Sequence, residues 1–300
     1  MKIRSSSASF LALLIILSCI PSSTAMGSEK PWKKLAENGD ALFQRGAYHA
    51  AVSVYKQAVD QNHESWQLHL RYGRALSRIG RQKDALAELF QSLFLNDKDP
   101  ASNISTRAEI ASIFLKQGNY DEAGGQLKQI LELKPDDMDV RGNYAVCLEQ
   151  LGFIELACEE LNMVARARPN SSTAFYNLGN ALFKKGDLKR AKLSFKRAIG
   201  LDPSNNLAIV ALGRTHMALG EDKLALIVLK KAVERNPNNH YAYLALGELY
   251  ESAGKQGDAA EVYKKAIQIN PRDPASKAAL SKLLDNSKSL VAQDRLDVTR

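Results

Sequence analysis

The sequence predicts an all-α fold, a solenoid in which helical hairpins are stacked one after another. Three series of small residues predict it, because each recurs through the chain at the same stride. Glycines lie 34 residues apart at all but one step: Gly46, Gly80, Gly118, Gly152, Gly186, Gly220 and Gly254. Small residues lie seven positions earlier: Gly39, Gly73, Ala111, Ala145, Gly179, Gly213 and Gly247. Alanines lie five positions later: Ala51, Ala85, Ala123, Ala157, Ala191, Ala225 and Ala259.

Each residue type has a physical reason for its place in the unit. The two series of flanking small residues allow two antiparallel helices to approach closely, since larger side chains would separate the backbones. The middle glycine provides a tight turn with a positive φ. Large apolar residues such as Leu178, Leu182, Leu188 and Phe195 fill the seam at helical spacing. Prolines, which cannot continue a helix, close five units: Pro135, Pro169, Pro203, Pro237 and Pro271.

Two units show the full pattern most clearly. They contain Phe175, Leu178, Gly179, Leu182, Ala191, Phe195, Ala198 and Pro203, and Tyr243, Leu246, Gly247, Tyr250, Ala259, Tyr263, Ala266 and Pro271. This pattern resembles the 34-residue signature of the tetratricopeptide repeat family, W-x2-L-G-x2-Y, then A-x3-F, then P. The resemblance implies a right-handed α-α superhelical solenoid of seven tetratricopeptide helical hairpins plus a C-terminal capping helix. The repeats are 32–65, 66–99, 104–137, 138–171, 172–205, 206–239 and 240–273.

Two regions depart from the regular tiling. The second unit carries four extra residues between Asn96 and Asn103, which predicts an altered joint between units two and three. Residues 274–284 have the apolar spacing of a helix that covers the last hairpin, and Asp273 is a candidate N-cap. Residues 285–300 are polar and without pattern, which predicts a disordered tail.

Residues 1–25 have the layout of a signal peptide. Lys2 and Arg4 precede an apolar run from residue 10 to 17, and Ala25 provides a small residue at the expected cleavage site. The run is too short for an ordinary membrane-spanning helix, which needs about 20 residues. We therefore expect an exported chain, periplasmic or secreted.

A second interpretation of the same segment stays open. The stretch Ile16-Leu17-Ser18-Cys19 resembles a permissive bacterial lipobox, in which Cys19 would carry the lipid. The chain would then be a pilotin-like lipoprotein, anchored to a membrane through Cys19. Membrane association is expected only in that case.

Composition and motifs argue against several classes of function. The net charge of +8 is mild for 300 residues, so a nucleic-acid partner is not expected. Motifs such as H-E-x-x-H, C-x-x-C, G-x-S-x-G and a phosphate-binding loop are missing from the sequence. No catalytic residue, metal or cofactor is therefore predicted, and the chain is expected not to be an enzyme.

His216 replaces a packed aromatic residue, which predicts a structural role for this histidine. Cys147 and Cys158 are interpreted as buried thiols or, outside the cytosol, as one disulfide.

The resemblance also implies where a partner would bind. In this family residues two, five, six, nine, twelve and thirteen of each unit line a concave groove, where arginines hold carboxylates and asparagines hold an extended peptide backbone. The alternative is that the arginines form a solvated face and that asparagine is merely common at these places. Tyr241, Glu248 and Glu251 add groove positions in unit seven, and Phe183 in unit five. The candidate groove residues are Arg71, Arg74, Arg78, Asn143, Tyr176, Asn177, Asn180, Lys184 and Arg214.

Basic pairs recur on the second helices of the last units: Lys196-Arg197, Lys230-Lys231 and Lys264-Lys265. They are interpreted either as the solvated side of an amphipathic helix or as a ridge for anionic lipid or an acidic partner.

These observations together predict a non-enzymatic scaffold or adaptor in the cell envelope. Its expected partner is a peptide or domain of another protein, bound in the concave groove. Assembly of a secretion, pilus, polysaccharide-export or outer-membrane complex would suit such a scaffold.

Overall fold

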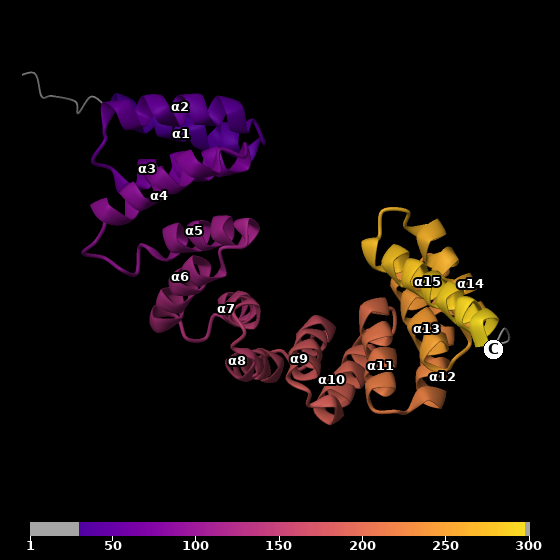
Figure 1. Cartoon of the computed structure of the whole chain (residues 1–300). Helices are drawn as coiled ribbons and strands as arrows, with labels where there is room; N and C mark the ends of the chain where they lie inside the picture. Colours follow the sequence, from indigo (N-terminus) through magenta and orange to yellow (C-terminus); the bar gives the residue numbers. More distant parts are fainter. Residues whose placement is uncertain (1–29, 298–300) are drawn as a thin grey trace, which may run out of the picture. The chain divides into compact units, whose positions relative to one another are not determined.

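The computed structural model describes residues 30–297, and within that range the chain forms fifteen helices and no strand. The predicted leader and Cys19 lie outside the described residues. The chain divides into two compact units, one reaching Thr106 and one starting at Arg107. The helices follow one another as antiparallel pairs, as the ribbon in Figure 1 shows. The predicted seven hairpins and C-terminal helix are confirmed, whereas the right-handed sense of the superhelix stays a prediction.

The first unit contains two complete hairpins. Helix α1 (Pro31–Gln44) pairs with α2 (Tyr48–Gln61), α3 (Trp66–Arg78) pairs with α4 (Gln82–Leu95), and α2 packs on α3. Tyr55, Leu68, Leu76 and Leu89 are fully buried at these contacts. Burial of such apolar side chains stabilises a hairpin that could not cover its apolar face alone.

The second unit contains the other five hairpins, although the first of their helices, α5, begins at residue 104. Helices α5 and α6 pack together through an apolar cluster that contains Ala111, Phe114, Ala123 and Leu127. Each later helix packs on the one before it. The helices are α5 (Ile104–Gln117), α6 (Tyr120–Leu133), α7 (Met138–Gln150), α8 (Ile154–Ala167), α9 (Ser172–Lys185), α10 (Leu188–Leu201), α11 (Asn206–Ala218), α12 (Asp222–Arg235), α13 (His240–Ser252), α14 (Gln256–Ile269) and α15 (Pro274–Asp297).

The three series of small residues have the roles that the sequence predicts. All seven turn glycines have positive φ values, from +70° at Gly220 to +86° at Gly152 and Gly186. A Cβ atom at Gly247 would lie 2.3 Å from a ring carbon of Tyr263, so this close approach requires glycine. All seven alanines of the third series are completely buried. The second helices of units three to seven end two residues before their prolines, as α8 does at Ala167.

The extra residues of the second unit form a closed turn. The Asn96 side chain donates to Oδ1 of Asn103 at 3.1 Å, and the Asn103 amide donates to the backbone carbonyl of Asn96 at 2.7 Å. Asn103 is almost completely buried. The two amides therefore replace the missing proline as the element that ends one hairpin and begins the next.

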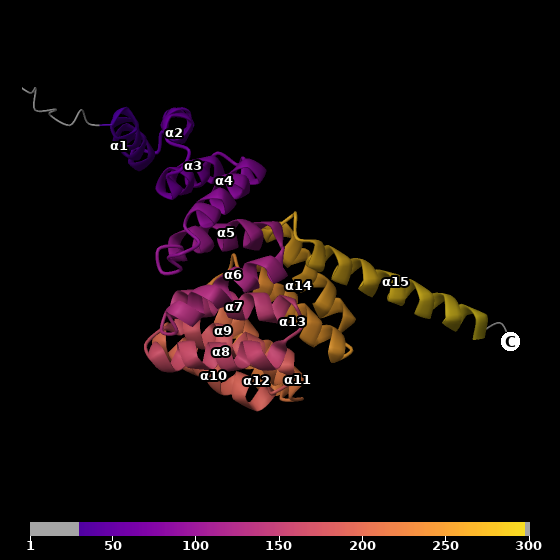
Figure 2. The same cartoon turned by 90° about the vertical axis from the view of Figure 1, so that its left-hand side faces the viewer.

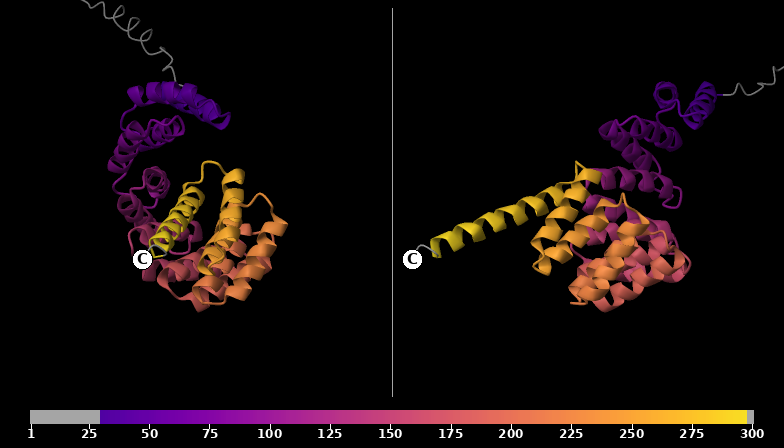
Figure 3. Two further views of the ribbon diagram at one scale, coloured as in Figure 1. Left: turned by 45° about the vertical axis from the view of Figure 1, so that its right-hand side comes forward. Right: turned by 90° about the vertical axis from the view of Figure 1, so that its right-hand side faces the viewer.

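The C-terminal helix differs from the predicted one. Asp273 caps it as expected, since its carboxylate accepts from the backbone N–H of Ser276 at 2.9 Å. The helix does not end at residue 284, however, but continues to Asp297, beyond the hairpin α13–α14 on which it packs (Figures 2 and 3). The prediction of a disordered tail from 285 is therefore wrong as far as Asp297. No glycine or second proline interrupts residues 275–297, so the backbone has no reason to leave the helix.

Among residues 30–297, no helix combines the length and the apolar character needed to cross a membrane.

Candidate partner-binding groove

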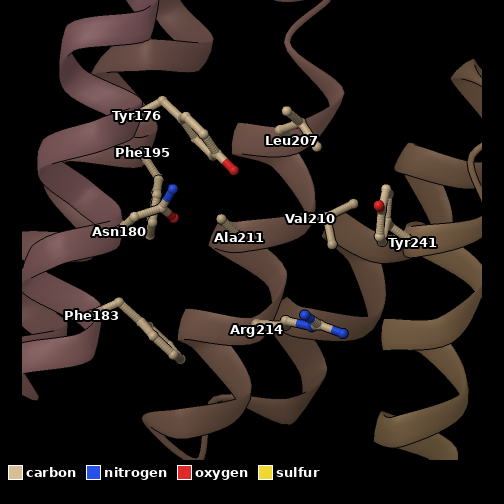
Figure 4. Close-up of a pocket in the computed structure, with 9 residues that line it drawn as sticks. All are labelled: Tyr176, Asn180, Phe183, Phe195, Leu207, Val210, Ala211, Arg214 and Tyr241. Atoms are coloured by element: carbon tan, nitrogen blue, oxygen red, sulfur yellow. The ribbon is translucent and has the colours of Figure 1, made fainter. Parts of the chain in front are cut away.

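The first helices of units four to seven line a groove in the second unit of the chain. Its central pocket has a volume of about 350 Å³. Figure 4 shows Tyr176, Asn180 and Phe183 on one side, pointing toward α11 and Ala211, whereas the Arg214 side chain extends from α11 toward α13. The pocket is lined by Tyr176, Asn180 and Phe183 of α9, Phe195 of α10, Leu207, Val210, Ala211 and Arg214 of α11, and Tyr241 of α13.

Two further pockets adjoin the central one. The first, of about 370 Å³, shares Asn180 and Phe183 with it and extends toward α7. The second, of about 670 Å³, shares Phe183 and Arg214 and extends toward Glu248 of α13. Because neighbouring pockets share lining residues, they form one continuous groove across α7, α9, α11 and α13. We call it the α7–α13 groove.

One ion pair links two of the helices that line this groove. Nη2 of Arg214 donates to Oε1 of Glu248 at 3.0 Å, and both side chains are 38% exposed. Burial raises the pKa of the Glu248 carboxyl, while the charge and hydrogen bond of Arg214 oppose that rise. The Nε atom of Arg214 is buried and lacks a hydrogen-bond partner in the part of the chain that the structure describes.

The candidate Lys184 is also paired. Its ammonium group contacts the carboxylate of Glu149 on α7, across one repeat interface. Both residues line the pocket next to the central one. The positive charge of Lys184 at the edge of the groove is therefore paired with the negative charge of Glu149.

The predicted asparagines occupy different places. Asn177 and Asn180 lie in the groove, with Asn177 exposed and Asn180 half-buried. Asn143 on α7 is exposed but does not line any of these three pockets. The structure thus brings together Tyr176, Asn177, Asn180, Lys184 and Arg214 and leaves Asn143 at the margin.

The three predicted arginines lie in the other unit of the chain, on α3. Nε of Arg71 lies 3.5 Å from Oδ1 of Asp40 on α1, and that carboxylate also accepts a hydrogen bond from the Tyr55 hydroxyl at 2.7 Å. Burial and the bond to Asp40 raise the pKa of Tyr55. Arg74 is half-buried and Arg78 is exposed in the last turn. Their role in partner binding stays a prediction.

Sequence reasoning missed the apolar part of the groove. Leu207, Val210 and Ala211 were not candidates, although they stand at positions two, five and six of unit six. The repeat position alone would have found them. The choice of polar residue types as candidates excluded them.

Other reactive side chains are buried away from the groove. Cys147 and Cys158 are free thiols, both buried, and burial raises the pKa of Cys147 to about 11. His216 is buried and contacts the carboxylate of Glu221, as a structural histidine would. Among residues 30–297, no three histidine, cysteine or acidic side chains are grouped so that they could hold a metal ion.

Similarity to known proteins extends over most of the described chain. Family profiles described as Tetratricopeptide repeat match residues 37–102, 114–181, 172–205 and 210–274. A solved tetratricopeptide repeat protein from Parabacteroides merdae has a TM-score of 0.65, with 17% identity over 85% of this chain and 100% of that one. This likeness concerns the fold alone.

Two curated proteins are similar over parts of their sequences. The BBSome complex member BBS4 of Bos taurus is 26% identical over 52% of this chain and 29% of its own length. The Protein O-mannosyl-transferase TMTC1 of Homo sapiens is 26% identical over 56% of this chain and 19% of its own length. The matches thus span less than a third of either relative. With the repeat profiles and the seven hairpins together, the chain belongs to the tetratricopeptide repeat family, whose fold is a general scaffold for protein–protein interaction.

Proposed function

We propose that the protein is a non-enzymatic scaffold or adaptor that holds an extended segment of a partner protein in the α7–α13 groove. The observation that supports this proposal is the continuity of the groove, because Phe183 lines all three adjoining pockets, while Asn180 and Arg214 each line two of them. A segment several residues long, rather than a compact small molecule, matches a binding site of that form.

The lining of the groove has the chemistry that an extended peptide needs. Tyr176, Phe183 and Leu207 offer an apolar recess for one large side chain of the partner. Asn177 and Asn180 can each donate to a backbone carbonyl and accept from a backbone N–H. The guanidinium of Arg214, which is 38% exposed, would donate to a carbonyl or carboxylate placed above the recess.

Peptide selection tests the proposal and does not require an identified partner. A displayed library of random peptides is selected on the full chain, and the peptides obtained are titrated calorimetrically against wild type, Phe183→Ala and Asn180→Ala. We expect a loss of affinity of about tenfold or more for Phe183→Ala, as for a central apolar contact. Leu156→Ala is the matched control, since Leu156 is an exposed aliphatic on the second helix α8. Peptides that bind all variants equally would refute the groove as the site.

The proposed setting of this scaffold is the cell envelope. Residues 1–25 have the layout of a signal peptide, so the mature chain would be periplasmic or secreted and could serve assembly of a secretion, pilus, polysaccharide-export or outer-membrane complex. Mass spectrometry of the mature N-terminus distinguishes this form from the pilotin-like lipoprotein. A chain beginning at Met26 supports a soluble exported scaffold, and a lipid on Cys19 supports the anchored form.

A further inference from the structure

The second helices of two consecutive hairpins carry the same exposed pattern, two lysines with one aliphatic residue between them. The two copies lie 34 residues apart, at the same repeat positions. We call this surface the α10–α12 patch. It consists of Lys189, Leu193 and Lys196 on α10 and of Lys223, Ile227 and Lys230 on α12.

The side chains of the patch are available at the surface. Leu193 is 66% exposed and Ile227 is 63% exposed. All four lysines are exposed, and the ion pairs found in residues 30–297 do not include them. Glu234, near the end of α12, is an acidic group on the same helix face. The patch therefore combines a net positive charge with two exposed aliphatic side chains.

The two halves of the patch lie on one side of the stack. Helices α10 and α12 both pack on α11, and residues 34 apart occupy equivalent places in consecutive hairpins. The neighbouring second helices lack the pattern, because the equivalents of Lys189 and Leu193 are Glu155 and Glu159 on α8 and Gly257 and Glu261 on α14. The patch is thus a local feature and not a general property of the repeat.

We propose that the α10–α12 patch contacts a membrane surface rich in anionic phospholipid. Lysine ammonium groups attract lipid phosphates while their methylene chains lie along the interface, and exposed aliphatic side chains enter the boundary between headgroups and acyl chains. An acidic protein is the alternative partner for a basic patch. Acidic proteins are more often bound by arginines, whose guanidinium groups form two hydrogen bonds with one carboxylate. Arg197 of α10 instead lies 5.8 Å from the Phe175 ring centre. The contact does not depend on the groove, which is lined by the first helices.

Vesicle sedimentation tests this proposal. The full mature chain is mixed with vesicles of phosphatidylcholine and phosphatidylglycerol, or of phosphatidylcholine alone, at low and high salt. We expect binding only to the anionic vesicles, weakened by salt. K196E/K230E should lower the partition coefficient about tenfold or more. The control K33E/K34E makes the same change of charge on exposed residues of α1 and should leave binding near wild type.

A second variant tests the aliphatic part of the contact. L193S/I227S keeps every charge and should weaken binding several-fold, since the apolar contribution is lost. Far-UV circular dichroism checks that each variant is folded, and K196A/K230A replaces the glutamate variant if it is not. Failure of the wild type to sediment with anionic vesicles, as expected if the occupant is an acidic protein, would overturn the proposal. Binding that K196E/K230E or L193S/I227S leaves unchanged would overturn it as well.

Discussion

Arg214 and Glu248, one repeat length apart in the sequence, meet at 3.0 Å across the interface of α11 and α13. Both occupy position nine of their units, so the register of the repeat places an arginine against a glutamate at the edge of the groove. The pair links the two helices and holds the guanidinium, whose buried Nε makes no hydrogen bond within the described residues. It therefore connects the stability of the solenoid with the chemistry of the groove.

Removal of this arginine is expected to lower stability. Arg214→Ala leaves Glu248 partly buried without its partner, which should cost about 1–2 kcal/mol at neutral pH for a pair of this exposure. Because the pKa of Glu248 is already raised, the loss should shrink as the pH falls and the carboxyl becomes protonated. Urea unfolding followed by circular dichroism measures both effects, and a loss that stays constant with pH would contradict this explanation.

The glycine that accommodates Tyr263 should not tolerate a side chain. A Cβ atom at position 247 would lie 2.3 Å from the ring, so Gly247→Ala should cost about 1–3 kcal/mol through overpacking. Gly125→Ala on α6 is the matched control, because nothing lies within 4 Å of the added Cβ atom there. That control should gain up to about 1 kcal/mol from helix propensity. Equal effects of the two changes in thermal unfolding would show that the close approach is not limiting.

The first unit should be less stable at higher pH because of His69. Its Nδ1 lies 2.6 Å from Glu88 and its Nε2 lies 2.9 Å from the carbonyl oxygen of His63, so both ring nitrogens face acceptors. Burial lowers the pKa of His69, but these hydrogen bonds and the charge of Glu88 outweigh it, and the pKa is raised. The stabilisation is full below the ordinary value of about 6.5 and is lost as the pH rises through the raised value.

Tryptophan fluorescence can follow this effect, since Trp32 and Trp66 both belong to the first unit. The urea midpoint of that unit should fall as the pH rises above about 6.5 in the wild type and change less in Glu88→Gln. A midpoint that rises with pH, or that falls equally in the variant, would contradict the role assigned to His69.

The two buried thiols should be unreactive in the folded chain. With a pKa raised to about 11, Cys147 has only about one thiolate in a thousand at pH 8. Burial also raises the pKa of Cys158. Iodoacetamide labelling, followed by mass spectrometry of the separate peptides, should be slow at both residues until denaturant is added. Rapid labelling of native Cys147 would show that α7 and α8 open readily.

The repeat explains why so much of the fold follows from the sequence. The positive φ of Gly186 recurs at all seven turns, and the close approach at Gly247 recurs in five units, whereas alanine takes that position in units three and four. The length of α15 could not be predicted in the same way, because polar residues without a breaker are compatible with either helix or coil. Packing on α13 and α14 starts that helix, and nothing in the sequence ends it before Asp297.

The candidate site was only partly predictable for a different reason. Repeat positions fix which side chains face the groove, so Tyr176, Asn177 and Asn180 were found. Whether a charged side chain there is paired depends on its neighbour in the adjoining unit, as for Lys184 with Glu149 of the preceding unit. Leu207 also stands at a groove position of its unit, but residue type gave no reason to single it out, because the candidates were chosen mainly for polar groups.

The most direct test of the groove as the binding site is photo-crosslinking with a selected peptide. Benzoylphenylalanine is placed at position 241, in the groove, or at position 156, on the second helix α8, and the full chain is irradiated with the peptide. We predict a crosslink from position 241 that maps to one segment of the peptide, and none from position 156. A crosslink from position 156 with none from position 241 would contradict the groove as the binding site.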